Sequence, residues 1–207
     1  MEIVKNINDE KGYPMQHYEV LQDLGDCFAC VGNFVSAQDC YEQAASLGPD
    51  EAGPYIGLGV IALQKDLLDD AESAFKIAVR LDKNSSKAYA GLAMALQRKG
   101  SHSQSFDMYL KSLELDSDNL ASLLGLFQTS CYMGSFSKVI FYLETYLNMH
   151  PADTSVMFTL AALYMKDNRL RDAKQTLQNI LALDGSNADA VKLLEEVEHQ
   201  LAAACQV

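Results

Sequence analysis

The chain has 207 residues, and 49% of them are apolar, which is enough to bury a core. Its formal net charge is -12, and it lacks the clustered Lys and Arg with which proteins neutralise phosphates, so we expect no binding to nucleic acid or to an anionic membrane surface. With four prolines, no tryptophan and abundant Ala, Leu, Asp and Glu, the expected fold class is all-α.

Residues 1–17 contain Gly12 and Pro14 and are expected to form an irregular segment. Their first twelve residues include three carboxylates and no apolar run that could serve as a signal-peptide core or a membrane span. The five cysteines are odd in number and irregularly spaced, which is typical of free thiols in a reducing compartment. We therefore expect a cytoplasmic protein without membrane insertion.

From residue 18 onward the sequence repeats with a period of 34 residues and no insertions. The five units are 18–51, 52–85, 86–119, 120–153 and 154–187. Apolar residues recur in each unit at positions 4, 7, 8 and 11 and again at 20, 24, 27 and 30, the spacing of two amphipathic helices. The seventh position is always Leu: Leu24, Leu58, Leu92, Leu126 and Leu160. Each unit is predicted to be a helical hairpin.

The turn inside each hairpin falls at position 15, where every residue type tolerates a left-handed backbone. These residues are Gly32, Asp66, Gly100, Gly134 and Asn168. After the last unit, Val191, Leu194, Val197 and Leu201 recur at helical spacing among polar residues. We therefore expect residues 188–207 to form a capping helix and a tail, since solenoid ends need polar-backed caps.

The columns of this alignment resemble the tetratricopeptide repeat, which has Leu at position 7, a small residue at 8, Ala at 20, an aromatic at 24 and Pro at 32. The resemblance covers 18–187 and implies a right-handed superhelical solenoid of five repeats with a C-terminal capping helix. It also implies a non-enzymatic protein that binds other proteins. The fourth repeat departs from the pattern at Phe127 and Ser130, which lie one helical turn apart and are interpreted as a volume swap within a packed interior. It also departs at Tyr146, where a local change in helix spacing is expected.

In the family, the first helix of each repeat lines a concave groove that binds a partner, and the resemblance assigns a set of residues here to that groove. They are Ile56, Gly57, Val60, Leu63, Lys87, Gly91, Met94, Leu124, Gln128, Phe158 and Met165. Because most are apolar, we expect the groove to take an apolar-anchored peptide or helix. Tight curvature, or residues 1–17 lying in the groove, would instead bury part of this strip.

Three consecutive repeats have Gly at position 6, inside a helix, where each costs about 1 kcal/mol relative to Ala. They are Gly57, Gly91 and Gly125. Two explanations stay open: the glycines let a ligand backbone approach closely, or they permit close contact between neighbouring helices.

The first repeat has seven carboxylates and no Lys or Arg, and Glu19, Asp23 and Asp26 form an acidic end of the expected groove. This end would attract a basic flank of a partner, or would simply be a solvated end of the solenoid. Family members that grip a C-terminal carboxylate use Lys, Asn and Arg. Only Lys87 matches that pattern here, so capture of an acidic chaperone tail is not expected.

Cys27 and Cys30 form a Cys-x-x-Cys motif, but in a predicted helix interior rather than at a helix N-terminus. We expect both to be small buried residues, with a thiol-redox enzyme as a minor alternative. The four histidines have no ligand spacing, so neither a metal site nor a cofactor is expected.

The sequence therefore predicts a non-enzymatic adaptor or scaffold that binds another protein or peptide through an apolar groove, with a basic flank of the partner at the acidic end. The main alternative is a chaperone that shields an apolar segment of a client, because the Gly-Leu-Gly of 57–59 resembles the first helices of bacterial secretion chaperones of this repeat family. Self-association through the same groove is also open.

Overall fold

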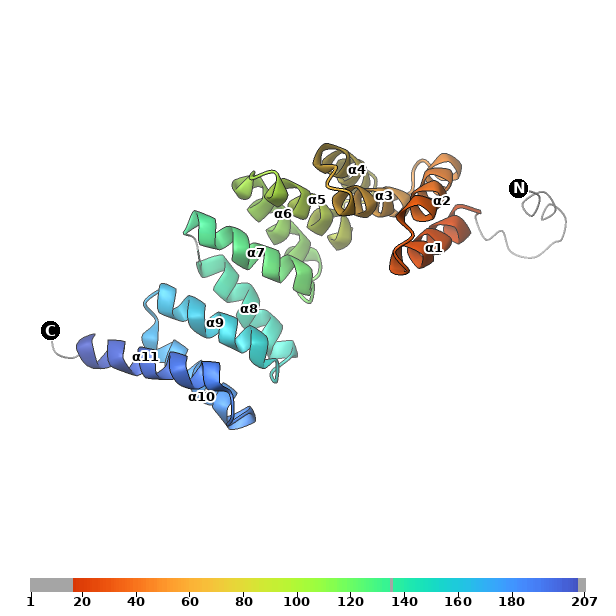
Figure 1. Cartoon of the computed structure of the whole chain (residues 1–207). Coiled ribbons are helices and arrows are strands. Elements are labelled where there is room, and N and C mark those ends of the chain that lie inside the picture. The colour runs from red at the N-terminus through yellow and green to blue at the C-terminus, as the bar shows by residue number, and fades with distance from the viewer. Residues whose placement is uncertain (1–16, 135, 205–207) are drawn as a thin grey trace. The chain divides into compact units, whose positions relative to one another are not determined.

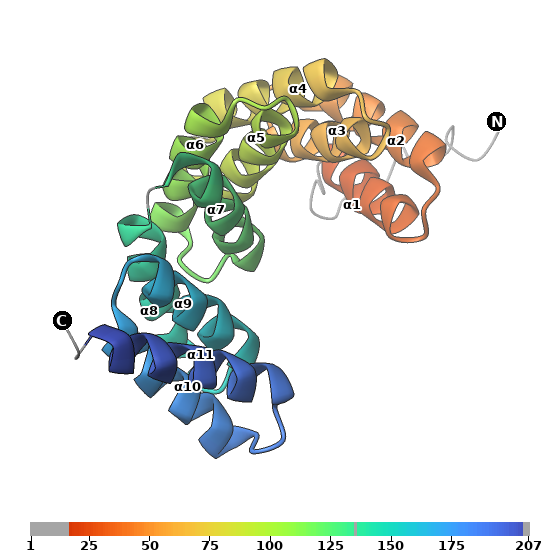
Figure 2. The same cartoon turned by 60° about the vertical axis from the view of Figure 1, so that its left-hand side comes forward.

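The computed structural model describes residues 17–134 and 136–204, and within these ranges every regular element is an α-helix (Figures 1 and 2). The helices are α1 (His17–Cys30), α2 (Phe34–Leu47), α3 (Ala52–Gln64), α4 (Leu68–Leu81), α5 (Ser86–Arg98), α6 (His102–Leu115), α7 (Leu120–Met133), α8 (Ser137–Met149), α9 (Thr154–Lys166), α10 (Leu170–Leu183) and α11 (Ala188–Ala204). The all-α fold class is confirmed. The expected irregular segment, apart from His17 in α1, and the end of the expected tail lie outside the described residues.

The helices pair into hairpins that repeat along the chain. α3, α5, α7 and α9 begin at 52, 86, 120 and 154, each 34 residues after the one before. We call α1, α3, α5, α7 and α9 first helices, and the even-numbered helices second helices. A solenoid of helical hairpins is therefore confirmed, whereas the division into five repeats stays a prediction.

The turns between first and second helices have the backbone that the sequence predicted. All five residues at repeat position 15 have positive φ: Gly32 (78°), Asp66 (61°), Gly100 (80°), Gly134 (65°) and Asn168 (58°). A left-handed residue ends a helix and lets the chain reverse direction. The hairpin turns are thus encoded locally in each unit.

Several first helices start at a residue whose side chain caps them. The side-chain oxygens of Ser85, Asn119 and Asp153 accept hydrogen bonds from backbone N–H groups three residues further on, at 3.2, 3.0 and 3.0 Å. Such caps satisfy amide donors that have no partner inside the helix. They fix the start of α5, α7 and α9.

The chain forms two compact units, unit 1 over residues 1–83 and unit 2 over residues 84–207. Unit 1 contains α1 to α4, with Ala37, Tyr41 and Ile61 buried at its centre. Unit 2 contains α5 to α11 around a larger core that includes Tyr109, Leu126 and Leu177. Each unit has its own buried cluster, as expected for stacked hairpins.

Two of the position-6 glycines, Gly57 in unit 1 and Gly125 in unit 2, lie against buried tyrosine rings. A Cβ atom at Gly57 would lie 2.5 Å from the Tyr41 ring, and one at Gly25 would lie 2.6 Å from the same ring. In unit 2, a Cβ atom at Gly125 would overlap the ring of Tyr109, whose side chain is 1% exposed. The glycines at 57 and 125 thus serve close packing between helices, the second of the two explanations that the sequence left open.

The hairpin of α7 and α8 is packed less closely than any other, as the sequence of the fourth repeat predicted. Phe127 occupies a position that holds Gly or Ala in the other repeats, and Tyr146 is buried at a position expected to be small. A bulky side chain at a position for a small one, as at Tyr146, is expected to widen the spacing of the helices. Sequence analysis had indicated this change without its direction.

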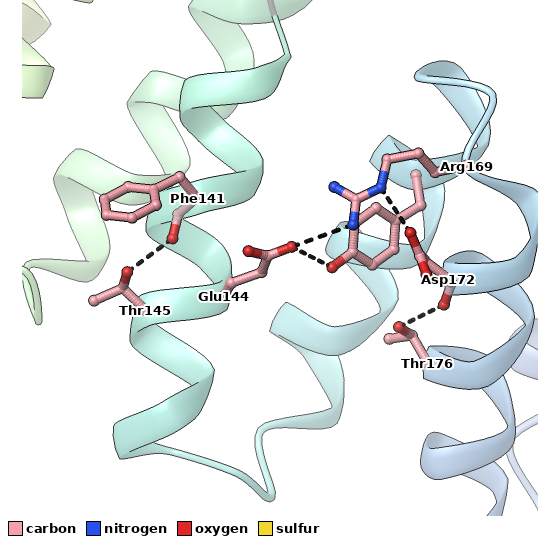
Figure 3. Close-up of polar contacts among 7 residues, drawn as sticks. Phe141, Glu144, Thr145, Arg169, Asp172 and Thr176 are labelled. Carbon is pink, nitrogen blue, oxygen red and sulfur yellow. Dashed lines mark hydrogen bonds and ion pairs between the residues drawn. The ribbon is translucent and has the colours of Figure 1, made fainter.

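Side chains of the next hairpin hold α8 instead (Figure 3). The Tyr164 hydroxyl of α9 donates a hydrogen bond of 2.6 Å to the carboxylate of Glu144 on α8. The Arg169 guanidinium lies 3.7 Å from Glu144, 2.7 Å from Asp172 and 4.4 Å from the centre of the Tyr164 ring. A charge-assisted hydrogen bond and a cation–π contact therefore tie α8 to α9 and α10.

Candidate functional site

In unit 1, the first helix α1 presents three carboxylates. Glu19, Asp23 and Asp26 are all exposed, and α1 contacts α3. Asp26 accepts a hydrogen bond of 2.6 Å from the hydroxyl of the buried Tyr41. The acidic end predicted from the sequence is therefore an exposed surface, one of whose carboxylates is fixed to the core.

The apolar residues predicted on α3 divide between surface and core. Val60 is 41% exposed and Ile56 is half-buried, but Leu63 is only 7% exposed and Gly57 is buried. The place of Leu63 and Gly57 in a partner-binding groove stays a prediction, and the sequence did not separate these buried residues from the exposed ones. The reason is that α3 is apolar on nearly every face, so the helical period could not separate its inner from its outer residues.

The first helices α5 and α7 of unit 2 contact each other and expose apolar side chains. Met94 on α5 is 40% exposed and Leu124 on α7 is 47% exposed. Lys87 is also exposed, whereas Gly91 is buried and offers no side chain. This apolar surface is the strongest candidate for partner binding in unit 2.

An amide pair borders that surface. Gln97 of α5 donates a hydrogen bond of 2.8 Å to the side-chain oxygen of Gln128 on α7, and accepts one of 2.6 Å from the Tyr109 hydroxyl. Gln128 therefore joins two first helices, and its place in a partner-binding groove stays a prediction. A ligand that broke the Gln97–Gln128 hydrogen bond would have to supply new hydrogen-bonding partners for both side-chain amides.

Further along unit 2, Phe158 and Met165 of α9 are half-buried and pack on the core. Beside Met165 lies a pocket of about 300 Å³, lined by Ala162, Met165 and Lys166 of α9 and by Leu193, Glu196 and Gln200 of α11. The sequence analysis missed the residues of α11 because it treated this helix only as a cap. Extending the 34-residue register to 188 places Leu193 and Glu196 at positions 6 and 9, which would have revealed them.

Three tyrosines lie behind these surfaces, and burial raises the pKa of each above its ordinary value of 10.0. For Tyr41 and Tyr164, hydrogen bonds to Asp26 and Glu144 raise the pKa further. For Tyr109, which is 1% exposed, burial is the cause. The folded state therefore favours the neutral phenols.

We expect the free energy of unfolding to fall as the pH rises above 10.0, because the unfolded tyrosines ionise there while the folded ones do not. Each such tyrosine contributes up to about 1.4 kcal/mol per pH unit. Urea unfolding of wild type and Tyr109→Phe checks this, since the variant should lose stability less steeply above pH 10.0. Equal slopes in the two proteins would contradict the assignment to Tyr109.

The thiols do not lie where the sequence placed them. Cys27 and Cys30 are exposed, so the expectation that both are buried was wrong. They occupy the last turn of α1, whereas redox Cys-x-x-Cys motifs occupy helix N-termini. Among the described residues, no group of three or more His, Cys, Asp or Glu side chains is placed to hold a metal ion, and no helix is both long and apolar enough to cross a membrane.

Comparison with protein-family models gives three matches, all described as tetratricopeptide repeat. They cover residues 31–86, 86–119 and 132–197. These ranges fall in both units and reach into α11, whereas α1 and most of α7 lie outside them. The resemblance inferred from the repeat columns is thereby confirmed.

Among solved structures, PilF of Pseudomonas aeruginosa aligns with a TM-score of 0.70 and 18% identity over 91% of this chain and 87% of its own. YrrB, described as a TPR protein with an unusual peptide-binding site, aligns at 0.65 and 14% identity over 83% and 89%. The first TPR of Spaghetti, bound to an HSP90 peptide, aligns at 0.55 and 23% identity over 58% and 95%. These likenesses establish the fold.

Two curated relatives match this chain over a part of their own length. The human protein O-mannosyl-transferase TMTC3 is 26% identical over 162 residues, which are 75% of this chain and 17% of TMTC3. The CTR9 homolog of Arabidopsis thaliana is 24% identical over 136 residues, which are 65% of this chain and 12% of that protein. The chain thus spans less than a fifth of either relative.

Proposed function

The chain belongs to the tetratricopeptide repeat family, and from this premise we propose that it is a non-enzymatic adaptor that binds a segment of a partner protein on its first helices. The observation that carries the proposal is the pair of exposed apolar side chains Met94 and Leu124 on the adjacent helices α5 and α7. Exposed apolar groups gathered on one face mark interaction surfaces. Leu124 supplies a branched anchor contact, and the unbranched Met94 adapts to the shape of the ligand.

The pocket between α9 and α11 extends the binding surface of unit 2. Its floor of Ala162, Met165 and Leu193 suits one apolar side chain, and Lys166 and Glu196 at its rim suit polar groups of the ligand backbone. A partner segment would place one anchor there. The apolar character of the ligand is thus supported at two places in unit 2.

Unit 1 contributes charge and a smaller apolar contact. Glu19 and Asp23 are exposed on α1, and Val60 is exposed on α3. A partner with a basic flank beside an apolar anchor complements this combination. YrrB and Spaghetti, which share the fold, are described with a peptide-binding site and a bound peptide, respectively, and this supports a peptide segment as ligand. We place the protein in the cytoplasm, where its exposed cysteines stay reduced.

The experiment that tests the proposal is selection of peptides from a display library by the wild-type chain, followed by calorimetry of the enriched peptides. We expect peptides with apolar anchors and Lys or Arg at one end. Failure to enrich any peptide over an unrelated helical protein would overturn the proposal. Co-expression with a protein that contains the enriched segment then separates the two roles: a chaperone raises the solubility of that protein, whereas an adaptor leaves it unchanged.

A further inference from the structure

The second helix α8 of unit 2 exposes an aromatic side chain where the other repeats are polar. Phe141 is 60% exposed. The equivalent positions of the other repeats hold Asp39, Ser73, Asp107 and Gln175. An exposed Phe in a column of polar residues is unexpected for a solvated face.

Phe141 borders a pocket between α6 and α8. The pocket has a volume of about 390 Å³ and is lined by Leu110 and Glu114 of α6 and by Ser137, Lys138, Phe141 and Tyr142 of α8. Leu110 is 8% exposed and adds a buried apolar side chain to the lining, and Phe141 and Tyr142 add two aromatic rings. This volume accommodates a side chain of a partner.

The contacts of α8 leave Phe141 on its outer side. Because α8 is tied to α9 and α10 through Glu144 and is packed only loosely on α7, its other side is left uncovered. Phe141 points away from the cluster of Glu144 and Arg169 (Figure 3). Phe141 therefore lies on the second helices, beside the pocket and on the side of α8 away from that cluster.

The rim of the pocket carries one cation, Lys138, for which the described part of the chain supplies no counterion. Glu114 is paired with Lys111, their Oε2 and Nζ atoms being 2.8 Å apart. Lys138 forms no ion pair with any described residue. The free charge at the pocket is therefore positive, in a chain whose net charge is -12. A ligand with a carboxylate beside its apolar group complements it.

We propose that the α6–α8 pocket is a second docking site, which takes an apolar side chain next to an Asp or Glu in a partner segment. It lies on second helices, whereas the proposed adaptor surface lies on first helices and favours a basic flank. One chain would then hold two segments of opposite charge. The site goes beyond the proposed function and does not depend on it.

The test uses two display libraries with a fixed central Leu, one flanked by Asp and Glu and the other by Lys and Arg. We expect the α6–α8 pocket to enrich acidic peptides whose affinity falls at least about tenfold in Phe141→Asp, which restores the polar character of the column. Lys138→Glu should weaken the same peptides, whereas Leu124→Glu, on the first helices, should bind them as wild type does. Circular dichroism confirms that each variant is folded.

Acidic peptides that bind Phe141→Asp and Lys138→Glu as tightly as wild type would overturn the proposal, and so would failure to enrich any. Sedimentation that shows a dimer dissociated by Phe141→Asp would also overturn it, by identifying a second copy of the chain as the occupant. Loss of binding in Leu124→Glu alone would place the acidic peptides on the first helices. Failure of this site leaves the adaptor surface untouched, because that surface is tested with different peptides.

Discussion

Replacing Gly57 with Ala is expected to lower the free energy of unfolding by about 1–3 kcal/mol, although Ala is the better helix former. The added methyl group would lie 2.5 Å from the Tyr41 ring. The ring cannot move away, because the backbone of α1 at Gly25 also packs closely against it. A Cβ atom at Gly25 would lie 2.6 Å from the same ring. Overpacking in a closed space therefore outweighs the gain in helix propensity. Urea unfolding followed by circular dichroism measures the loss.

The control removes the ring. In a Tyr41→Leu background, Gly57→Ala should cost nothing or should stabilise the protein by about 1 kcal/mol, the ordinary difference between Gly and Ala in a helix. The two substitutions thus form a double-mutant cycle with a large coupling energy. A loss of equal size in both backgrounds would show that the ring is not the reason for the glycine. Stabilisation by Gly57→Ala in the wild-type background would show the same.

Leu124→Glu is expected to weaken a peptide selected by wild type at least about tenfold. Burying a Leu contributes about 1.5–3 kcal/mol, and a carboxylate in its place would be desolvated against apolar groups of the ligand. Because Leu124 is 47% exposed, the substitution should leave folding nearly unchanged. Calorimetric titration of the peptide measures the change in Kd.

The matched control is Gln175→Glu, which adds the same charge to the exposed face of α10. It should bind the peptide as wild type does. Equal weakening by Gln175→Glu would assign the effect to net charge rather than to the surface around Leu124. Unchanged binding by Leu124→Glu would remove that residue from the site.

The hairpins and their turns could be predicted from the sequence because the information is local and repeated. Gly100 and Asp66 take the same left-handed backbone at the same repeat position. The period also located the irregularity of the fourth repeat, through Tyr146. It could not show how α8 repacks, because the bond from Tyr164 to Glu144 joins residues of two neighbouring hairpins at positions that vary between repeats.

The site was less predictable, for two physical reasons. On α3 almost every residue is apolar, so Leu63 and Val60 are equivalent in the sequence although one is buried and the other exposed. On α1 the repeat pattern predicts a buried Leu24, yet this residue is 43% exposed. A first helix is covered by the repeat before it, and α1 is the first helix that the structure describes. The exposure of Cys27 on α1 has the same cause, because the residues at its repeat position are buried in the other units. Cys30 stands at a position that is exposed in every unit, at Gln64, Arg98, Tyr132 and Lys166.

The measurement that tests the central claim most directly is photocrosslinking of the selected peptide from a benzoylphenylalanine placed at position 124 or at position 175. If partners bind on the first helices, the peptide crosslinks to the chain from position 124 and not from position 175, and unlabelled peptide competes with the reaction. A crosslink from position 175, with none from position 124, would contradict the account.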